Sequence, residues 1–440
     1  MVPRLLQEQR GTIFMPTQQR SLLDIWKKFI TADILTKLKN AFNDGNNIVG
    51  TRKSKKDATK TEKHLLLDNR KALQSFAVYI YICAKGDRSS EVTKNQRFKR
   101  KQINGAIEDL KERHAHLDQK SFVGRDSIET ILSRVLFSLD DISEISKNFR
   151  SILDSVGQYA AGDEKLFHFS GDSQHSRPVP NKPREVGLMF YELACMLKVN
   201  GVELPYMMDI LLHNGENSFV PAHGIVQRWV EAIKAVETTS TVMKDQNDPN
   251  LAWLVFNSNC TTSAVRDWLI EKGQKFIAFV EHDSFNKEAS LIHRIPTPDH
   301  PNVSRSIWNH STNEVYTYYN DAMEVVEKKF CIAWGLERTE DQHIVRACSC
   351  MTPAYSHCEQ MLKVCDTFNS ALHDKSWPHP RGGNGVRGDL GCHHDFIMAC
   401  IMQNVRNAWF ALNVCDPSSV SFEEMMTDLA MDIYTHSLQY

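Results

Sequence analysis

The sequence predicts an α/β fold in which a mixed-sheet module interrupts an all-helical domain. Three observations predict it. Apolar residues recur at helical spacing in the first third of the chain, and short apolar or aromatic runs of strand length fill the middle. After Asn320 the helical spacing returns. A helical domain split by an α/β insertion is the simplest arrangement that accounts for this order.

Length and composition are those of a soluble protein with a sizeable core. The 440 residues are 42% hydrophobic and 24% charged, and the net charge of -2 indicates neither a nucleic-acid nor a membrane partner. The longest apolar run, which starts at Ser75, has about half the length that spans a bilayer. The N-terminus also lacks the apolar centre of a secretory signal. We therefore expect an intracellular protein with no membrane partner.

The first third is predicted to be helical. One helix follows Ser21, and a second begins after Thr31 as N-cap and ends at the sequence Asn-Asp-Gly, residues 43–45. A third covers about residues 69–84, and two more amphipathic segments are predicted over residues 127–141 and 148–162.

The most basic stretch of the chain lies between the third helix and these segments. It contains Arg97, Lys99, Arg100 and Lys101. This stretch is either a solvated loop with a helix start or a surface that contacts DNA phosphates, since clustered Lys and Arg release counterions from DNA.

The α/β module is predicted to begin at Asp163. Strands are expected over residues 165–169, 187–197, 202–213, 251–258, 275–282 and 314–320, with helices over residues 224–237 and 263–273. From residue 321 onwards we expect helices over residues 321–336, 355–374, 393–412 and 421–434.

The eleven cysteines do not form a recognisable framework. Most of them lie in the Cys/His-rich region 343–415, where a zinc site is one interpretation. However, the chain contains no Cys-x-x-Cys pair, which is the usual half of a structural zinc site. The sequence therefore favours buried, reduced thiols over zinc.

The order of three strands, a helix and a strand is also that of the RNase H-like core. In that core, acids on the first strand, after the fourth strand and on a later helix hold two divalent metal ions that act at phosphorus. Here Asp163 stands at the start of the first strand, Asn257 and Ser258 follow the fourth strand, and the later helix carries Glu327 with Glu324 one turn earlier. A hydroxyl or an amide supplies only a neutral oxygen, so the middle ligand replaces a bridging carboxylate poorly.

Several motifs resemble those of the piggyBac transposases and the domesticated proteins derived from them. The first acid with its strand, residues 163–166, and the Pro-Asn-Lys-Pro turn, residues 180–183, are similar to the family pattern without a gap. The segment from Asn257 resembles the family's Asp-Asn-Phe-Phe-Thr-Ser segment, with Ser258 at the place of the catalytic Asp. The third catalytic position falls on Glu327. The similarity extends over about residues 20–435.

The departures from the family concern DNA cleavage and end recognition. The second catalytic Asp is replaced, the third is a Glu, and a further family aspartate is Phe330 here. A basic residue expected near DNA is Glu281, and the cysteine-rich zinc module with Cys-x-x-Cys pairs is absent.

The resemblance implies a domain organisation. Residues 1–18 would form an N-terminal tail and residues 19–160 the first part of a helical DNA-binding and dimerisation domain. Residues 161–332 would form the RNase H-like catalytic-type domain, and residues 333–440 the second helical part.

It also implies a nuclear, DNA-associated protein with a degenerate site at Asp163, Ser258 and Glu327. We expect no catalysis by this chain alone, and pairing as a homodimer or with an active piggyBac relative. Two alternatives stay open. One is an active transposase or nuclease that uses Mg²⁺ on Asp163 and Glu327; the other is a protein-interaction scaffold with no DNA role.

Overall fold

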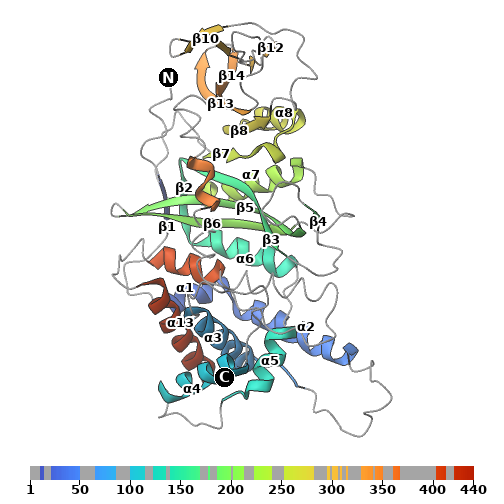
Figure 1. Ribbon diagram of the computed structural model, residues 1–440, viewed down its shortest axis with the longest axis vertical. Coiled ribbons are helices and arrows are strands. Elements are labelled where there is room, and N and C mark those ends of the chain that lie inside the picture. Colours follow the sequence, from blue (N-terminus) through green and yellow to red (C-terminus); the bar gives the residue numbers. More distant parts are fainter. Residues whose placement is uncertain are drawn as a thin grey trace. The chain divides into compact units, whose positions relative to one another are not determined.

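The computed structural model describes the chain in segments that gather into two compact units (Figure 1). Unit 1, the α/β unit, contains residues 1–15, 149–165 and 190–368; unit 2, the helical unit, contains residues 16–148, 166–189 and 369–440. The domain boundaries expected from the sequence stay predictions. The described residues are 10–13, 21–49, 65–85, 100–113, 122–134, 139–168, 177–178, 186–199, 202–212, 222–239, 252–281, 295–297, 300–305, 308–309, 314–315, 329–339, 342–349, 360–366, 403–412 and 421–440.

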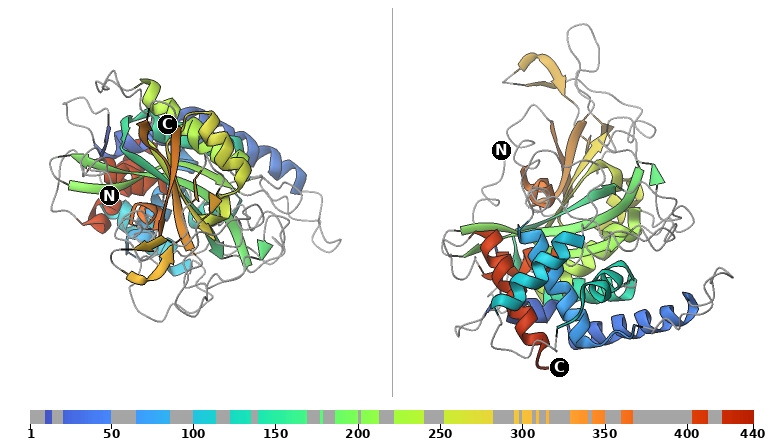
Figure 2. Two further views of the ribbon diagram at one scale, coloured as in Figure 1. Left: turned by 90° about the horizontal axis from the view of Figure 1, so that it is seen from above. Right: turned by 60° about the horizontal axis from the view of Figure 1, so that its bottom comes forward.

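The helical unit is built around α3, Asn69–Lys85. Every residue of α3 from Ala72 to Ala84 is buried, as expected for a helix that is covered on all sides. The last helix, α13 (Phe422–Ser437), packs along α3, and both panels of Figure 2 show the helices of this unit. Among the described residues, the other helices in or entering the unit are α1 (Leu22–Phe29), α2 (Ala32–Val49), α4 (Arg100–Arg113), α5 (Arg125–Arg134) and α6 (Leu139–Ser151), and a further helix covers residues 403–412.

The helix starts that were predicted from Ser21 and Thr31 are confirmed. Ser21 and Asp24 form a reciprocal capping box at α1, and the Ile34 backbone N–H donates to Thr31 Oγ1 at 3.3 Å. The same reciprocal box between Ser421 and Glu424 opens α13. These caps satisfy backbone donors that the first turn of a helix leaves unpaired.

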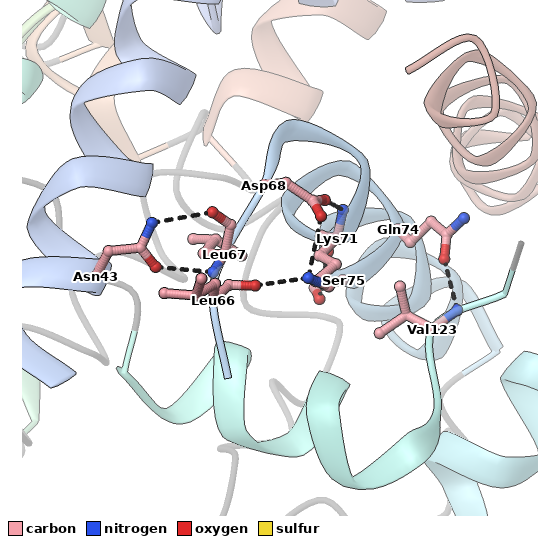
Figure 3. A network of polar contacts seen from close by, with 8 residues as sticks. All are labelled: Asn43, Leu66, Leu67, Asp68, Lys71, Gln74, Ser75 and Val123. Atoms are coloured by element: carbon pink, nitrogen blue, oxygen red, sulfur yellow. Dashed lines mark hydrogen bonds and ion pairs between the residues drawn. The ribbon is translucent and has the colours of Figure 1, made fainter. Parts of the chain in front are cut away.

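The predicted end of the second helix at residues 43–45 is wrong, because α2 continues to Val49. Tertiary contacts explain the difference. The Asn43 side chain donates to the Leu67 carbonyl at 3.1 Å and accepts from the Leu67 N–H at 2.8 Å (Figure 3). An asparagine whose amide is engaged in this way no longer competes for the backbone of its own helix.

Figure 3 also shows the polar contacts that connect the start of α3 to neighbouring segments. Lys71 donates to the Leu66 carbonyl at 2.7 Å and forms an ion pair with Asp68 at 3.0 Å. Farther along α3, the buried Gln74 side chain accepts from the Val123 N–H at 2.9 Å, just before α5 begins. The segments on either side of α3 are therefore tied to it by polar contacts as well as by its apolar surface.

Ten of the described strands form one mixed sheet, in the order β14-β13-β8-β7-β3-β5-β1-β2, with β4 and β6 on β5. Their bounds are β1 (Arg10–Ile13), β2 (Leu153–Gly157), β3 (Tyr159–His168), β4 (Arg177–Pro178), β5 (Val186–Val199), β6 (Val202–Leu212), β7 (Trp253–Phe256), β8 (Phe276–Glu281), β13 (Lys329–Thr339) and β14 (Gln342–Ser349). Two short hairpins, β9 (Ile295–Thr297) with β10 (His300–Arg305) and β11 (Trp308–Asn309) with β12 (Glu314–Val315), lie outside this sheet. The short β12 is what the structure describes of the strand expected over residues 314–320.

The central strands of the sheet lie in the order β6-β5-β3-β7-β8. β5 and β6 form an antiparallel hairpin, whereas β3, β7 and β8 run parallel to one another. Helix α7 (Ala222–Thr239) connects β6 to β7. The short 3-10 helix η3 (Ser258–Cys260) and α8 (Ser263–Glu271) connect β7 to β8. This arrangement brings the end of β7 beside the middle of β3.

Three expectations about the α/β unit need correction. The strand that carries Asp163 begins at Tyr159 rather than at Asp163, because residues 159–162 pair with β7. The segment predicted to be amphipathic over residues 148–162 instead contains the end of α6, the strand β2 and the start of β3, with Gly157 at a φ of 81° in the turn between the two strands.

The third correction concerns the helix predicted over residues 321–336. Residues from Lys329 onwards form β13, which pairs with β8 in a register that sets the backbone of Cys331 opposite that of Phe279. The alternation of Phe330, Ile332 and Trp334 suits a strand, and an available neighbouring strand decides between the two structures. β14 then pairs with β13, so this part of the chain is not helical.

No helix among the described residues is long and apolar enough to cross a membrane.

Candidate functional site

Strand β3 carries Asp163 and fixes which way it faces. Gly162 precedes it and lies under the Trp229 ring of α7, where an added Cβ would come within 2.6 Å of the ring carbons. Only glycine therefore fits this close approach. Because successive residues of a strand face opposite sides, Asp163 lies on the sheet face opposite α7.

The end of β7 brings Asn257 to Asp163. Gly162 pairs with Phe256, so the next residue on each strand meets its counterpart. The Asn257 amide Nδ2 donates to Asp163 Oδ1 at 2.6 Å, and the Glu164 backbone N–H donates to the same oxygen at 2.8 Å. The other end of that amide, Asn257 Oδ1, is buried and has no hydrogen-bond partner among the described residues. The partly buried Asp163 is thus stabilised by N–H donors of the protein.

The neighbouring acid, Glu164, is held by the same turn. Asn259 Nδ2 donates to Glu164 Oε1, and Glu164 is buried although Asn259 is exposed. The turn itself is braced, because Thr261 Oγ1 donates to the Asn257 carbonyl at 2.9 Å and Thr262 caps α8. Both acids of β3 therefore receive amides from one short, ordered segment, residues 257–259.

The structure places the other predicted catalytic residues as follows. Ser258 is the first residue of η3, directly after Asn257, and is half-buried. Glu327 lies outside the described residues. In the turn of residues 257–259, Asn257 donates a hydrogen bond to Asp163. The predicted second acid position is the next residue, Ser258.

Three further residues of the site were not predicted from the sequence. Glu192 on β5 is only 1% exposed, Lys165 on β3 is buried, and Cys365 from the segment 360–366 is buried. The Cys365 thiol donates to the Ala161 carbonyl of β3 at 3.2 Å. A signal existed for Glu192, since it is a lone charge within an apolar, aromatic run of strand length.

Burial and nearby charges shift several pKa values here. Burial raises the pKa of the Cys365 thiol well above its usual value, and the charges of Asp163, Glu192 and Asp366 act in the same direction. Burial likewise raises the pKa of Cys260, with Glu164 and Asp163 contributing. Both thiols are therefore protonated near neutral pH, and neither is a nucleophile or a metal ligand in that form.

The pKa of the Lys165 ammonium is lowered, mainly by burial, whereas Glu192 and Asp366 oppose that shift. The buried Lys165 and Glu192 therefore interact with each other, and the exposed Asp366 interacts with Lys165 from the surface. A lysine two residues after the first acid, on the same strand face, is an unusual neighbour for a carboxylate that would hold a divalent cation.

The described residues do not fit a two-metal site. Within the described part of the chain, no group of three or more His, Cys, Asp or Glu side chains is placed to hold a metal ion. Asp163 Oδ1 already accepts from two N–H donors, and its neighbour after β7, Asn257, is an amide with a neutral oxygen. Mg²⁺ requires several hard oxygen ligands, usually with carboxylates among them.

Four cysteines whose side chains the structure describes are free thiols. Cys83, Cys195, Cys260 and Cys365 are buried and unbridged. Cys365 belongs to the region 343–415, and the side chains of the other cysteines of that region lie outside the description. The preference for thiols over zinc stays a prediction for them.

The predicted DNA-contacting residues are described only in part. Arg97 and Lys99 lie outside the described residues. Arg100 and Lys101 form the first turn of α4, although their side chains are not described. The predicted helix start is thus confirmed at Arg100, and the role of these side chains stays a prediction.

Comparisons with known proteins support the fold. A piggyBac transposase, determined by cryo-electron microscopy in its synaptic complex with hairpin DNA, is similar to this chain with a TM-score of 0.58. The match covers 98% of this chain and 84% of the transposase chain at 12% sequence identity. No protein-family model and no curated protein sequence matches. The resemblance inferred from the motifs is therefore confirmed at the level of the fold.

Proposed function

We propose that this protein is derived from a piggyBac transposase, associates with DNA, and has lost the ability to cut it. Three features support the proposal. The fold is similar to that of a transposase whose structure contains hairpin DNA. The strand order β6-β5-β3-β7-β8 is the order 3-2-1-4-5 of an RNase H-like core. The helical unit is contributed by segments on both sides of the α/β unit, as in a split DNA-binding domain.

The observation that carries the loss of cleavage is the hydrogen bond between Asn257 and Asp163. A first catalytic acid must keep its oxygens available to metal ions that activate the nucleophile. Here the Asn257 amide lies 2.6 Å from Asp163 Oδ1, and Ser258 stands at the predicted second acid. Removing a bridging carboxylate from a two-metal site disrupts metal binding, so this site is inactive in the proposed protein.

A cleavage assay tests the catalytic part. The purified full-length chain is incubated with supercoiled plasmid and with hairpin DNA in Mg²⁺ or Mn²⁺, beside Asp163→Ala. We expect no nicking by either protein. Nicking that Asp163→Ala abolishes would instead establish the alternative, an active metal-dependent nuclease.

A binding assay tests the DNA part. We expect fluorescence anisotropy with labelled duplex DNA to show binding that weakens steeply with salt, because bound phosphates release counterions. Replacing Arg97, Lys99, Arg100 and Lys101 together by Gln should reduce the slope of log K against log[salt] by about 0.9 for each phosphate that the protein no longer neutralises. Binding without a salt dependence, or none, would favour the scaffold alternative.

A matched control removes the same amount of charge elsewhere. Lysines on described helices and turns outside the basic stretch serve this purpose: Lys39, Lys147, Lys234 and Lys272. Their replacement by Gln should leave the salt slope nearly unchanged. An equal reduction in both quadruple variants would mean that net charge, and not the α4 start, governs binding.

Nuclear localisation and self-association complete the proposal. We propose that the helical unit pairs with a second copy or with an active piggyBac relative. Sedimentation of the chain alone and mixed with such a relative would detect either complex. Imaging of a fluorescent fusion would test the nuclear location.

A further inference from the structure

A buried group of charges occupies one face of the sheet beside Asp163. Lys165 lies two residues after Asp163 on β3, and Glu192 lies on the adjacent strand β5. Glu192 is 1% exposed and Lys165 is 9% exposed. Charged groups with so little access to water are costly unless they are paired.

Cys365 shows that these residues lie together. Its thiol donates to the Ala161 carbonyl on β3 at 3.2 Å and lies close to the Ala194 backbone N–H on β5. Gly162 lies under Trp229 of α7, so Asp163 and Lys165 face away from α7. Leu193 pairs with Asp209, whose carboxylate accepts from Arg228 of α7, so Glu192 also faces away from α7. Both strands thus present these charged side chains on the face opposite α7.

This placement creates a need for a cation. Asp163 and Glu192 bring two carboxylates onto one face of adjacent strands, and like charges on neighbouring strands destabilise a sheet. In a two-metal site, divalent ions offset the repulsion between such carboxylates. The described residues offer no such ion a set of three ligands. Lys165 lies on the same strand face as Asp163, and Glu192 is close enough to oppose the lowering of the Lys165 pKa by burial.

We propose that Lys165 is a resident cation that takes the electrostatic place of a divalent metal ion in this acidic site. Its ammonium balances Asp163 and Glu192, so that the native protein binds no divalent cation there. The inference deepens the proposed function, since it explains how the acidic strand stays folded without metal. It is tested without DNA, so its failure is separate from that of DNA association.

The test measures thermal stabilisation by Mn²⁺ in the full-length chain. We expect the melting temperature of the native protein to be unchanged by millimolar Mn²⁺. Lys165→Gln removes the charge, and we expect it to melt lower without metal and to recover about 3 °C or more with Mn²⁺. Lys165→Arg keeps the charge and should behave like the native protein.

The double variant Lys165→Gln with Asp163→Asn identifies the site. Its failure to respond to Mn²⁺ would place the ion at Asp163. A Mn²⁺ response of the native protein that Asp163→Asn abolishes would overturn the proposal. So would a Lys165→Gln protein that folds and shows no Mn²⁺ response.

Glu192→Gln, alone and combined with Lys165→Gln, tests the charge pair even if Lys165→Gln alone does not fold. Glu192→Gln alone should also lower the melting temperature, because it leaves Lys165 with less compensation. Combining Glu192→Gln with Lys165→Gln should then lower it by less than the sum of the two single changes. Additive decreases would show that Lys165 does not balance Glu192 and would overturn the proposal.

Discussion

The amide of Asn257 donates to the carboxylate of Asp163 across the parallel pair β3–β7, with 2.6 Å between Nδ2 and Oδ1. The two residues are 94 positions apart in the sequence. The sheet register brings them together, since each follows directly after the paired residues Gly162 and Phe256. The predicted first acid is thus a hydrogen-bond acceptor within the protein.

Replacing Asn257 tests this hydrogen bond. Asn257→Ala removes one donor and should lower the free energy of unfolding by about 1 kcal/mol. Asn257→Asp also sets a second carboxylate against Asp163, so it should be less stable than Asn257→Ala at pH 7. Because protonation relieves that repulsion, the gap should narrow as the pH falls towards about 4. Urea unfolding at several pH values measures it, and equal stability of the two variants at pH 7 would contradict the hydrogen bond.

Gly162 should not tolerate a side chain. Gly162→Ala would bring its Cβ within 2.6 Å of the Trp229 ring, and we expect the free energy of unfolding to fall by about 1–3 kcal/mol in urea unfolding. Gly105 in α4 is the matched control, since a Cβ there would meet nothing within 4 Å. Gly105→Ala should stabilise the chain by up to about 1 kcal/mol through helix propensity. Similar effects of both substitutions would show that the Trp229 ring does not lie tightly against Gly162.

Asp209 on β6 binds two arginines, Arg150 at the end of α6 and Arg228 on α7. Its carboxylate is 1% exposed and accepts from Arg150 Nη1 at 2.8 Å and from Arg228 Nη2 at 3.0 Å. Asp209→Asn leaves both guanidinium groups facing a neutral amide, so we expect the free energy of unfolding to fall by about 3 kcal/mol. Asp267→Asn removes an exposed partner of Arg266 and should cost less than about 1 kcal/mol. A small effect at Asp209 would mean that water reaches this site.

Glu424 should make the start of α13 sensitive to acid. Hydrogen bonds from the Ser421 backbone and hydroxyl lower the pKa of Glu424 below its ordinary value of 4.5. Because the pKa is lower in the folded chain, the stabilisation is complete above about pH 4.5 and is lost as the pH falls through the folded pKa. Thermal melts of the native chain and of Glu424→Gln between pH 7 and pH 3 should therefore converge at low pH. A constant difference would contradict the ionised capping box.

Local patterns were sufficient for the helices of the first third. The helix expected after Ser21 begins there, Thr31 acts as the predicted N-cap, and the segment from Ala72 to Ala84 forms the buried central helix. These features depend on neighbours within a few residues, so they can be read from the sequence. The predicted end at Gly45 failed because Asn43 is engaged by Leu67, which is 24 residues away.

By itself the sequence determined the helices of the first third, the order β5, β6, α7, β7, α8 and β8 that follows the strand of Asp163, and the serine at the predicted second acid. The tertiary structure decided that β3 begins at Tyr159, that residues from Lys329 form a strand, and that Asn257 donates to Asp163. It also decided that Lys165 and Glu192 are buried near Cys365. The physical reason is pairing between strands. A strand is stabilised by hydrogen bonds to a neighbour that is distant in sequence, and its register determines which side chains meet.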